Sequence, residues 1–200
     1  MLQKELCIPY FVYSSITMAY KGKVINNTKT GQQITFIQTS DDTGGELLEM
    51  ESLFQPHSTE PVPHFHPFQE EYFAILEGEI NVRLNGQLKI LKQGDQLYLK
   101  KGQVHSMWNH SSQKARVNWK VIPASDTEYF FENGIGIANH KKANEQGMPG
   151  LLQLALLAKR FSHVYRIAKP PFVIQKIIFS ILTPISYLAG YRSCYKEFVD

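Results

Sequence analysis

The sequence has few cysteines, no basic stripe and no internal repeat. Its two cysteines, Cys7 and Cys194, lie near opposite ends and in no pairing motif, so we expect no disulfide framework. Reduced thiols of this kind are typical of a cytoplasmic protein. The 21 Lys and Arg and the 18 Asp and Glu are scattered along the chain. Without a basic stripe, we expect no nucleic-acid partner.

The sequence also lacks an apolar run long enough to span a membrane. Residues 172–188 are apolar-rich, but Gln175 and Lys176 interrupt them, and a spanning helix needs about twenty predominantly apolar residues. We therefore do not expect membrane association, with a membrane-surface role for this segment as the alternative. The apolar residues 6–19 are interrupted by Pro9, which favours an N-terminal strand or arm over a signal peptide.

What the chain has instead is a series of short strand patterns. Residues 46–54 alternate, with the side chains at 48, 50, 52 and 54 on one face and glutamates on the other. Asn85-Gly86 predicts a tight hairpin, because both residues tolerate a positive φ. Further strands are predicted at residues 33–38, 72–76, 80–84, 88–91, 96–99, 104–109 and 114–122. So many short strands with turn residues between them indicate an all-β sandwich or barrel.

The pattern changes from strands to helices at Pro123. The predicted elements are a short helix at 128–131, a loop through Gly134, Gly136 and 139–147, a helix at 151–169, and a helix at 172–188 kinked at Pro184. We therefore expect two units. Residues 1–123 form a β-barrel with its N-terminal arm, and residues 124–200 form a helical extension that packs on the barrel or on a partner subunit, as in a homodimer.

Two histidines, His64 and His66, are followed by two carboxylates, Glu70 and Glu71. On a strand, residues i and i+2 face the same way, so both imidazoles can point to one place. Glu70 shares the strand parity of the histidines, but Pro67 lies between and makes that parity unreliable, so both carboxylates stay open. Two histidines and a carboxylate form a metal site that leaves coordination positions open.

Residues 64–78 and 94–109 together resemble the two motifs of the cupin superfamily. The first motif reads His-x-His, four residues, Glu, six residues, Gly, which places Glu71 in the carboxylate position. The second motif is carried by Gly94, Gly102, His105 and Asn109, with the short spacer between motifs that is usual in compact bacterial cupins. Two turn positions depart from the pattern, with Ser58 in place of a glycine and Lys100 in place of a proline.

This resemblance implies a mainly β protein, a cupin jelly-roll β-barrel with C-terminal α-helices. It also implies one divalent metal ion at the mouth of the barrel, held by His64, His66, Glu71 and His105, with Glu70 as the fallback carboxylate. Fe²⁺, Mn²⁺, Zn²⁺ and Ni²⁺ all suit such ligands. Asn109 is expected to support the end of the barrel instead of binding the metal.

Other polar and aromatic residues have no motif support. We interpret His57, His110, His140 and His163 as surface or loop residues, and Trp119 as part of the core or of the barrel wall.

The functional hypotheses follow from the metal site and the helices. The first is a metal-dependent enzyme of the dioxygenase type that acts on a small organic substrate. The alternatives are a non-catalytic module that binds a small ligand, and an interaction protein that uses its apolar C-terminal helices. The order of the barrel, the Phe-rich helix and the last two helices also resembles a group of bacterial cupins, but no reaction follows from that resemblance.

Overall fold

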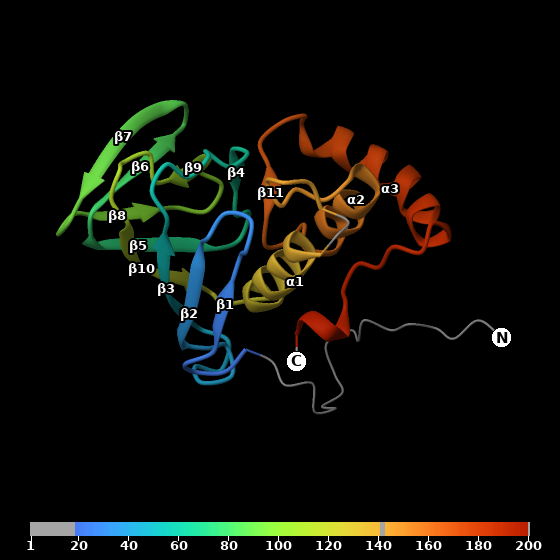
Figure 1. Ribbon diagram of the computed structural model, residues 1–200. Coiled ribbons are helices and arrows are strands. Elements are labelled where there is room, and N and C mark those ends of the chain that lie inside the picture. The colour runs from blue at the N-terminus through green and yellow to red at the C-terminus, as the bar shows by residue number, and fades with distance from the viewer. Residues whose placement is uncertain (1–18, 141–142, 200) are drawn as a thin grey trace.

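The structure, a computed structural model, describes residues 19–140 and 143–199, which form two antiparallel sheets with three α-helices beside them (Figure 1). The first sheet contains, in spatial order, β1 (Val24–Asn26), β2 (Gln33–Gln38), β3 (Leu48–Phe54), β10 (Ala115–Ile122), β5 (Glu70–Glu77) and β8 (Gln96–Leu99). The second contains β11 (Arg166–Ile167), β4 (His64–Phe65), β9 (His105–Trp108), β6 (Glu79–Leu84) and β7 (Gln87–Lys92). The helices are α1 (Thr127–Asn139), α2 (Leu151–Arg160) and α3 (Phe172–Leu188), followed by the 3₁₀ turn η1 (Lys196–Phe198). The predicted mainly β class with C-terminal helices is confirmed.

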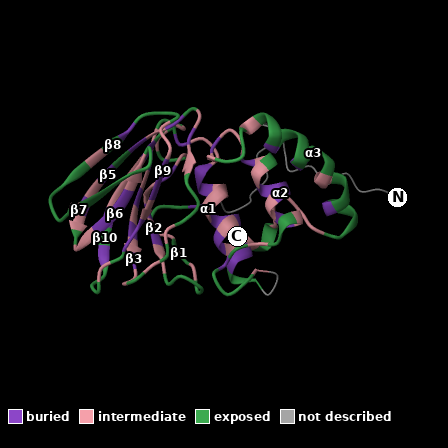
Figure 2. Ribbon diagram, turned by 90° about the horizontal axis from the view of Figure 1, so that it is seen from above, coloured by how far each residue is buried: buried purple, intermediate pink, exposed green. Residues whose placement is uncertain are grey.

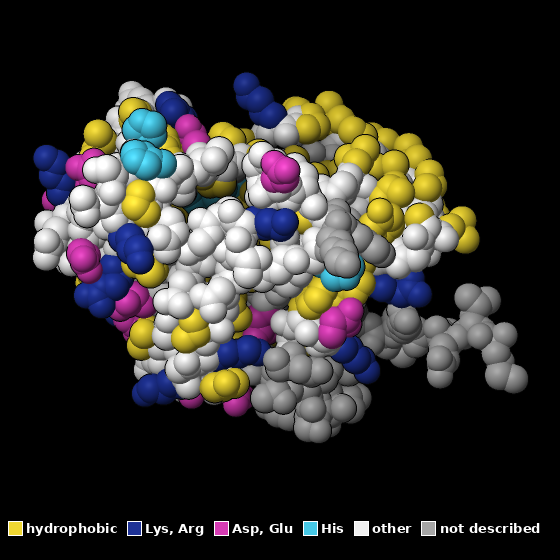
Figure 3. All heavy atoms as spheres, in the orientation of Figure 1, with side chains coloured by type: hydrophobic (Ala, Val, Ile, Leu, Met, Phe, Trp, Pro, Cys, Tyr) yellow, Lys and Arg dark blue, Asp and Glu magenta, His cyan; other side chains and the backbone are white. Residues whose placement is uncertain are grey.

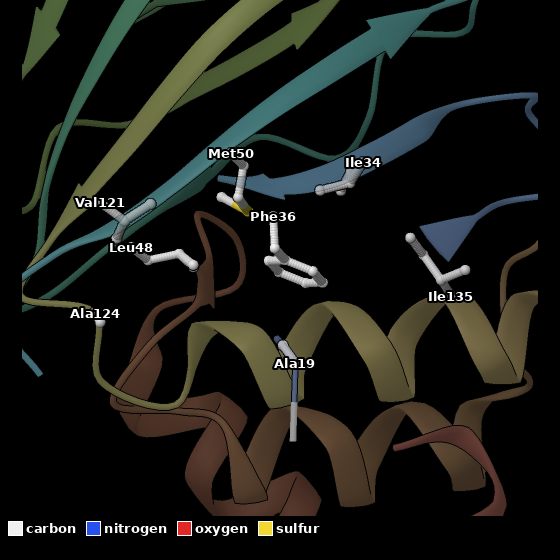
Figure 4. Packing of buried hydrophobic residues seen from close by; sticks show 8 residues of the cluster. All are labelled: Ala19, Ile34, Phe36, Leu48, Met50, Val121, Ala124 and Ile135. Carbon is white, nitrogen blue, oxygen red and sulfur yellow. The ribbon is translucent and has the colours of Figure 1, made fainter. Parts of the chain in front are cut away.

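Strand alternation produces the core, as the sequence predicts. Along β3, buried and half-buried residues alternate without a break, and the buried set includes Leu48 and Met50. These two side chains lie with Phe36 of β2 in one apolar cluster between the sheet and α1, and Ile135 of α1 belongs to the same cluster (Figure 4). A second apolar cluster fills the space between the two sheets, with contributions from β5, β6 and β10. Because α1 covers one sheet, the barrel is joined to the helical part through packed apolar side chains.

The turns have the backbone geometry that their residues favour. Asn85 and Gly86 both have positive φ, 48° and 86°, and they connect β6 and β7 as a two-residue hairpin. At the place of the missing proline, the Lys100 N–H donates to Gln103 Oε1 at 2.7 Å and closes the turn before β9. The hairpin prediction is confirmed, and the unusual lysine is accommodated by a side-chain hydrogen bond.

The prediction of a short helix followed by a glycine loop is wrong. α1 continues through Gly134 and Gly136 to Asn139. A Cβ on Gly136 would lie 2.3 Å from Cγ of Phe198, whereas nothing lies within 4 Å of one on Gly134. Gly136 therefore allows the last turn of the chain to approach the helix, and it does not break the helix.

The predicted helix at residues 151–169 is also wrong in its second half. α2 ends at Arg160, and the chain then turns back to form β11. β11 pairs antiparallel with β4, with Arg166 opposite Phe65 and Ile167 opposite His64. The helical extension thus contributes a strand to a sheet of the barrel. The division of the chain at residue 123 stays a prediction.

α3 has the predicted bounds and contains Pro184. It packs on α2, on the side of the molecule away from the barrel (Figure 2). None of the described helices is long and apolar enough to cross a membrane. The predicted N-terminal arm lies outside the described residues except for Ala19, and Cys7 lies outside them as well.

Candidate metal centre

Three histidines from neighbouring strands meet at the end of the second sheet. His64 of β4 lies directly opposite His105 of β9 in the antiparallel pairing, and His66 follows two residues after His64. One nitrogen atom from each of the three rings lies within 4.8 Å of the others. His66 and His105 are buried and His64 is half-buried. Sequence positions 64, 66 and 105 are therefore brought together, and the group could hold a metal ion.

Each of these histidines is oriented by a main-chain carbonyl group. The Nδ1 atoms of His64, His66 and His105 lie 3.1, 2.7 and 3.1 Å from carbonyl oxygens. The carbonyl groups belong to Val62, Val164 and Gln103, respectively. Because a carbonyl oxygen only accepts, the proton of each neutral ring resides on Nδ1, and the lone pair resides on Nε2. A metal-binding histidine is commonly fixed through its second nitrogen in this way.

Glu71 completes the group from the first sheet. It is 1% exposed, and its Oε2 lies 3.1 Å from Nε2 of His105 and 3.3 Å from Nε2 of His66. Its Oε1 accepts a hydrogen bond of 3.0 Å from Trp119 Nε1. Glu70 interacts with Tyr98 instead. The chain bends at Pro67, so the alternation of side-chain directions before the bend does not continue into β5. As a result Glu71, and not the fallback Glu70, faces the histidines.

The unpartnered polar atoms of the group favour binding of a cation. Within the described structure, Nε2 of His66 and Oε2 of Glu71 are buried and have no hydrogen-bond partner. Unpartnered buried polar atoms cost free energy, and facing lone pairs repel one another unless a proton or a metal ion lies between them. Three imidazole nitrogens and one carboxylate oxygen form a donor set that divalent iron, manganese, zinc and nickel accept, so the residues fit a metal.

Two pKa values have shifted in the direction that metal binding requires. Burial raises the pKa of Glu71, but the charge of His66 and the hydrogen bond and charge of His105 outweigh it and lower the value to about 2. Burial, together with the charges of His105 and His66, lowers the pKa of His64 to about 3. Near neutral pH, Glu71 is therefore ionised and His64 is neutral, the protonation states in which both can donate electron pairs.

The segment 164–168 lies across the histidines, and the sequence analysis missed it. The ring of Tyr165 stacks on His64 with centroids 4.5 Å apart, and on its other side it stacks on Phe130 at 5.0 Å. The Ala168 N–H donates to the Pro63 carbonyl oxygen at 2.8 Å. We call residues 164–168 the strap. Its Val-Tyr-Arg-Ile run before two prolines is a strand signal that could have revealed it.

The remaining predicted residues have structural positions. Asn109 is buried, donates to the Gln113 carbonyl oxygen at 2.6 Å and accepts from Ser111, so it closes the turn at the end of the barrel. His57, His110 and His140 are exposed, as predicted. His163 is not a simple surface residue, because its Nε2 lies 3.1 Å from Oδ2 of Asp126.

The fold and the site together define a small β-barrel with a histidine-rich centre at one end. Residues 50–121 match the family model described as the cupin domain. These residues, which make up the barrel around the histidines, are thus similar to a cupin domain, in agreement with the two motifs.

Two curated proteins illustrate the similarity. The chain is 35% identical to "Tetracenomycin polyketide synthase protein TcmJ" of Streptomyces glaucescens over 60 residues, which is 30% of this chain and 40% of TcmJ. It is 29% identical to "Probable oxidoreductase virH" of Hypocrea virens over 151 residues, 69% of this chain and 67% of the relative. The chain thus spans less than half of TcmJ.

A solved structure from Thermotoga maritima, described as that of a predicted oxalate decarboxylase, is also similar. Its TM-score is 0.46 at 20% identity, over 56% of this chain and 99% of that one.

Proposed function

We propose that His64, His66, Glu71 and His105 hold one divalent metal ion and that the protein is a metal-dependent oxidoreductase of the dioxygenase type. The observation that carries the proposal is the convergence of three imidazoles and one carboxylate, with each Nδ1 engaged elsewhere and with the buried His66 Nε2 lacking a hydrogen-bond partner among the described residues. When bound, such a metal supplies open coordination positions and Lewis acidity toward a small oxygen-containing substrate.

The residues around the centre have separate roles in this proposal. Glu71 balances part of the metal charge, and Trp119 holds its second oxygen in place. The strap keeps water away from His64 and His66. Apolar side chains such as Phe73 and Met107 fill the barrel beside the centre, which favours an apolar or aromatic substrate.

The names of the relatives support the same chemistry. Proteins similar to this chain are named as oxidoreductases, and TcmJ is named as part of polyketide synthesis. We therefore propose phenols and diketones, the functional groups of polyketides, as the first substrates to examine.

Metal content and oxygen consumption test the proposal together. Protein purified without chelators or added metal should contain about one divalent ion per chain, and His66→Ala should abolish it, whereas the exposed His110→Ala should not. Iron-loaded protein should consume O₂ with a phenolic or diketone substrate. Metal retained in His66→Ala would contradict the metal site, and turnover that survives this substitution would contradict the catalytic role.

The strap also favours a second candidate, a non-catalytic module that keeps a metal and a small ligand enclosed. Neither of two surface hollows, of about 340 and 550 Å³, includes one of the three histidines among its lining residues. Tyr165 stacks on His64, and His66 and His105 are buried, which suits retention better than turnover. A ligand recovered unchanged from the purified protein, together with a melting temperature that depends on metal but no O₂ consumption, would favour this candidate.

A further inference from the structure

α3 presents an apolar surface to solvent along most of its length. A narrow stripe with Gln175, Phe179 and Ser186 packs inward, and Ser186 Oγ donates to the Leu152 carbonyl oxygen of α2 at 2.9 Å. The rest of the helix is largely exposed (Figure 2). Eight large apolar side chains of α3 are at least 40% exposed, among them Leu188 at 90%. Hydrophobic side chains accordingly gather over α3 in the space-filling view (Figure 3).

This surface is too large for an ordinary solvent-exposed face. Soluble monomers rarely expose a contiguous apolar patch of more than a few hundred Å², whereas eight side chains this exposed amount to on the order of 800 Å². A helix that is apolar on nearly all sides is normally buried. No described residue of this chain covers the outer face of α3.

The charge around α3 indicates what covers it. Residues 146–196 contain seven Lys and Arg and no Asp or Glu. The rest of the chain has fourteen basic and eighteen acidic residues, so the positive charge is concentrated in the part that carries α3. Lys169 lies just before the helix and Lys176 on it, and both are exposed.

These observations separate the candidate occupants. A second copy seated on α3 would bring two basic segments together, which is unfavourable. A nucleic acid would require a row of phosphate contacts, but Lys176 is the single charged residue of α3. An apolar helix with basic residues on and beside it matches a surface that is apolar below and negatively charged above. That combination describes an anionic bilayer.

We propose that α3 lies in the plane of an anionic lipid surface, with its isoleucine-rich face among the acyl chains and the neighbouring lysines on the headgroups. The contact is interfacial, because no described helix could cross a membrane. It corresponds to the membrane-surface role that the sequence left as the alternative for this segment. The first part of α3 also contacts the strap, since Gln175 Nε2 donates to the Ile167 carbonyl oxygen at 2.9 Å.

Vesicle sedimentation with the full-length protein tests this assignment. The probes are vesicles of phosphatidylcholine alone and of phosphatidylcholine mixed with phosphatidylserine. Binding should require phosphatidylserine and weaken as salt rises. The double variant Ile177→Ser/Ile181→Ser should weaken binding by at least about ten-fold. The matched control Leu88→Ser/Ile90→Ser, at two apolar residues of β7 that are each 52% exposed, should bind like the parent.

A second pair of variants examines the charge and does not alter the apolar face. Lys169→Gln/Lys176→Gln should weaken binding by about five-fold for each lysine removed, whereas Lys89→Gln/Lys92→Gln on β7 should not. Circular dichroism and melting curves establish that the variants are folded, and if the isoleucine pair unfolds, the lysine pair carries the test.

Two results would overturn the proposal. One is a parent protein that sediments with neither kind of vesicle at low salt. The other is vesicle binding that survives both α3 variants. A mass of two chains by light scattering that falls to one in Ile177→Ser/Ile181→Ser, without vesicle binding, would assign the face to a second copy.

Discussion

The Nδ1 atom of His66 lies 2.7 Å from the carbonyl oxygen of Val164, a residue 98 positions further along the chain. This hydrogen bond fixes the tautomer and the ring orientation of a central histidine, and its acceptor belongs to the helical extension instead of the barrel. Loss of such a partner of a metal-binding histidine typically costs about 10- to 100-fold in metal affinity. The extension is therefore part of the site, and several measurable consequences follow from its contacts.

The ring of Tyr165 should control how fast a chelator removes the metal. Tyr165→Ala removes the ring that stacks on His64 and should accelerate extraction by EDTA, because water then reaches the centre. Tyr165→Phe keeps the ring and is the matched control, with extraction close to that of the parent. Stopped-flow or competition measurements with a chromogenic chelator provide the rates, and equal rates for both variants would contradict a covering role for the ring.

Trp119 should position Glu71 and thereby tune metal affinity. Trp119→Phe retains most of the aromatic volume but removes the N–H that donates to Oε1 of Glu71, so affinity should fall by about 10- to 100-fold. Trp108→Phe is the control, because the Trp108 ring packs under Arg83 and makes no hydrogen bond to Glu71 in the described structure. Isothermal titration calorimetry with Zn²⁺ measures the metal affinity of both variants. An unchanged affinity for Trp119→Phe would show that Glu71 needs no such support.

The two glycines of α1 should respond in opposite directions to alanine. Gly136→Ala places a methyl group against the Phe198 side chain and should destabilise the protein by on the order of 1–3 kcal/mol. Gly134→Ala meets nothing within 4 Å and should stabilise the helix by about 0.5–1 kcal/mol. Urea denaturation of both variants measures the difference, and equal changes in the free energy of unfolding would contradict the close approach of Phe198.

Glu128 should make the protein less stable as pH rises. Burial, opposed by a hydrogen bond from the Ser40 N–H and aided by the charge of Glu132, raises the pKa of Glu128 to about 7. Between about pH 4.5 and pH 7, the unfolded chain has lost this proton while the folded protein retains it. Stability therefore falls with rising pH over that interval.

Glu128→Gln removes this titration, so its melting temperature relative to the parent should be higher at pH 8 than at pH 5. The exposed Glu46→Gln is the control and should show no such change. If the difference in melting temperature between Glu128→Gln and the parent is the same at pH 5 and pH 8, the prediction is contradicted.

The strands were predictable because their patterns are local. Residues 33–38 and 96–99 alternate and are bounded by turn residues, and the structure has strands with those bounds. The convergence of His64, His66 and His105 was predictable only through the motif spacing. The choice of the carboxylate also depended on that spacing, because strand parity alone would have favoured Glu70 over Glu71. The roles of these residues as metal ligands stay a prediction.

The errors have a common physical cause, which is tertiary contact. Gly136 is a poor helix former, and nothing nearby in sequence shows that Phe198 requires the space beside it. The end of α2 at Arg160 and the extended strap depend on pairing with β4, about a hundred residues earlier in the chain. The secondary-structure propensity of a short segment does not predict contacts with distant parts of the chain.

The pairing of β11 with β4 also protects the edge of a sheet. At the opposite edge, β7 is exposed to solvent, and Lys89 and Lys92 on it discourage pairing with another chain. β4 has no lysine and would offer its unpaired main-chain groups, next to two histidines, if β11 were detached. Loss of the strap would thus open the metal centre and expose a template for intermolecular β-pairing, so that inactivation and aggregation of this protein would begin at the same place.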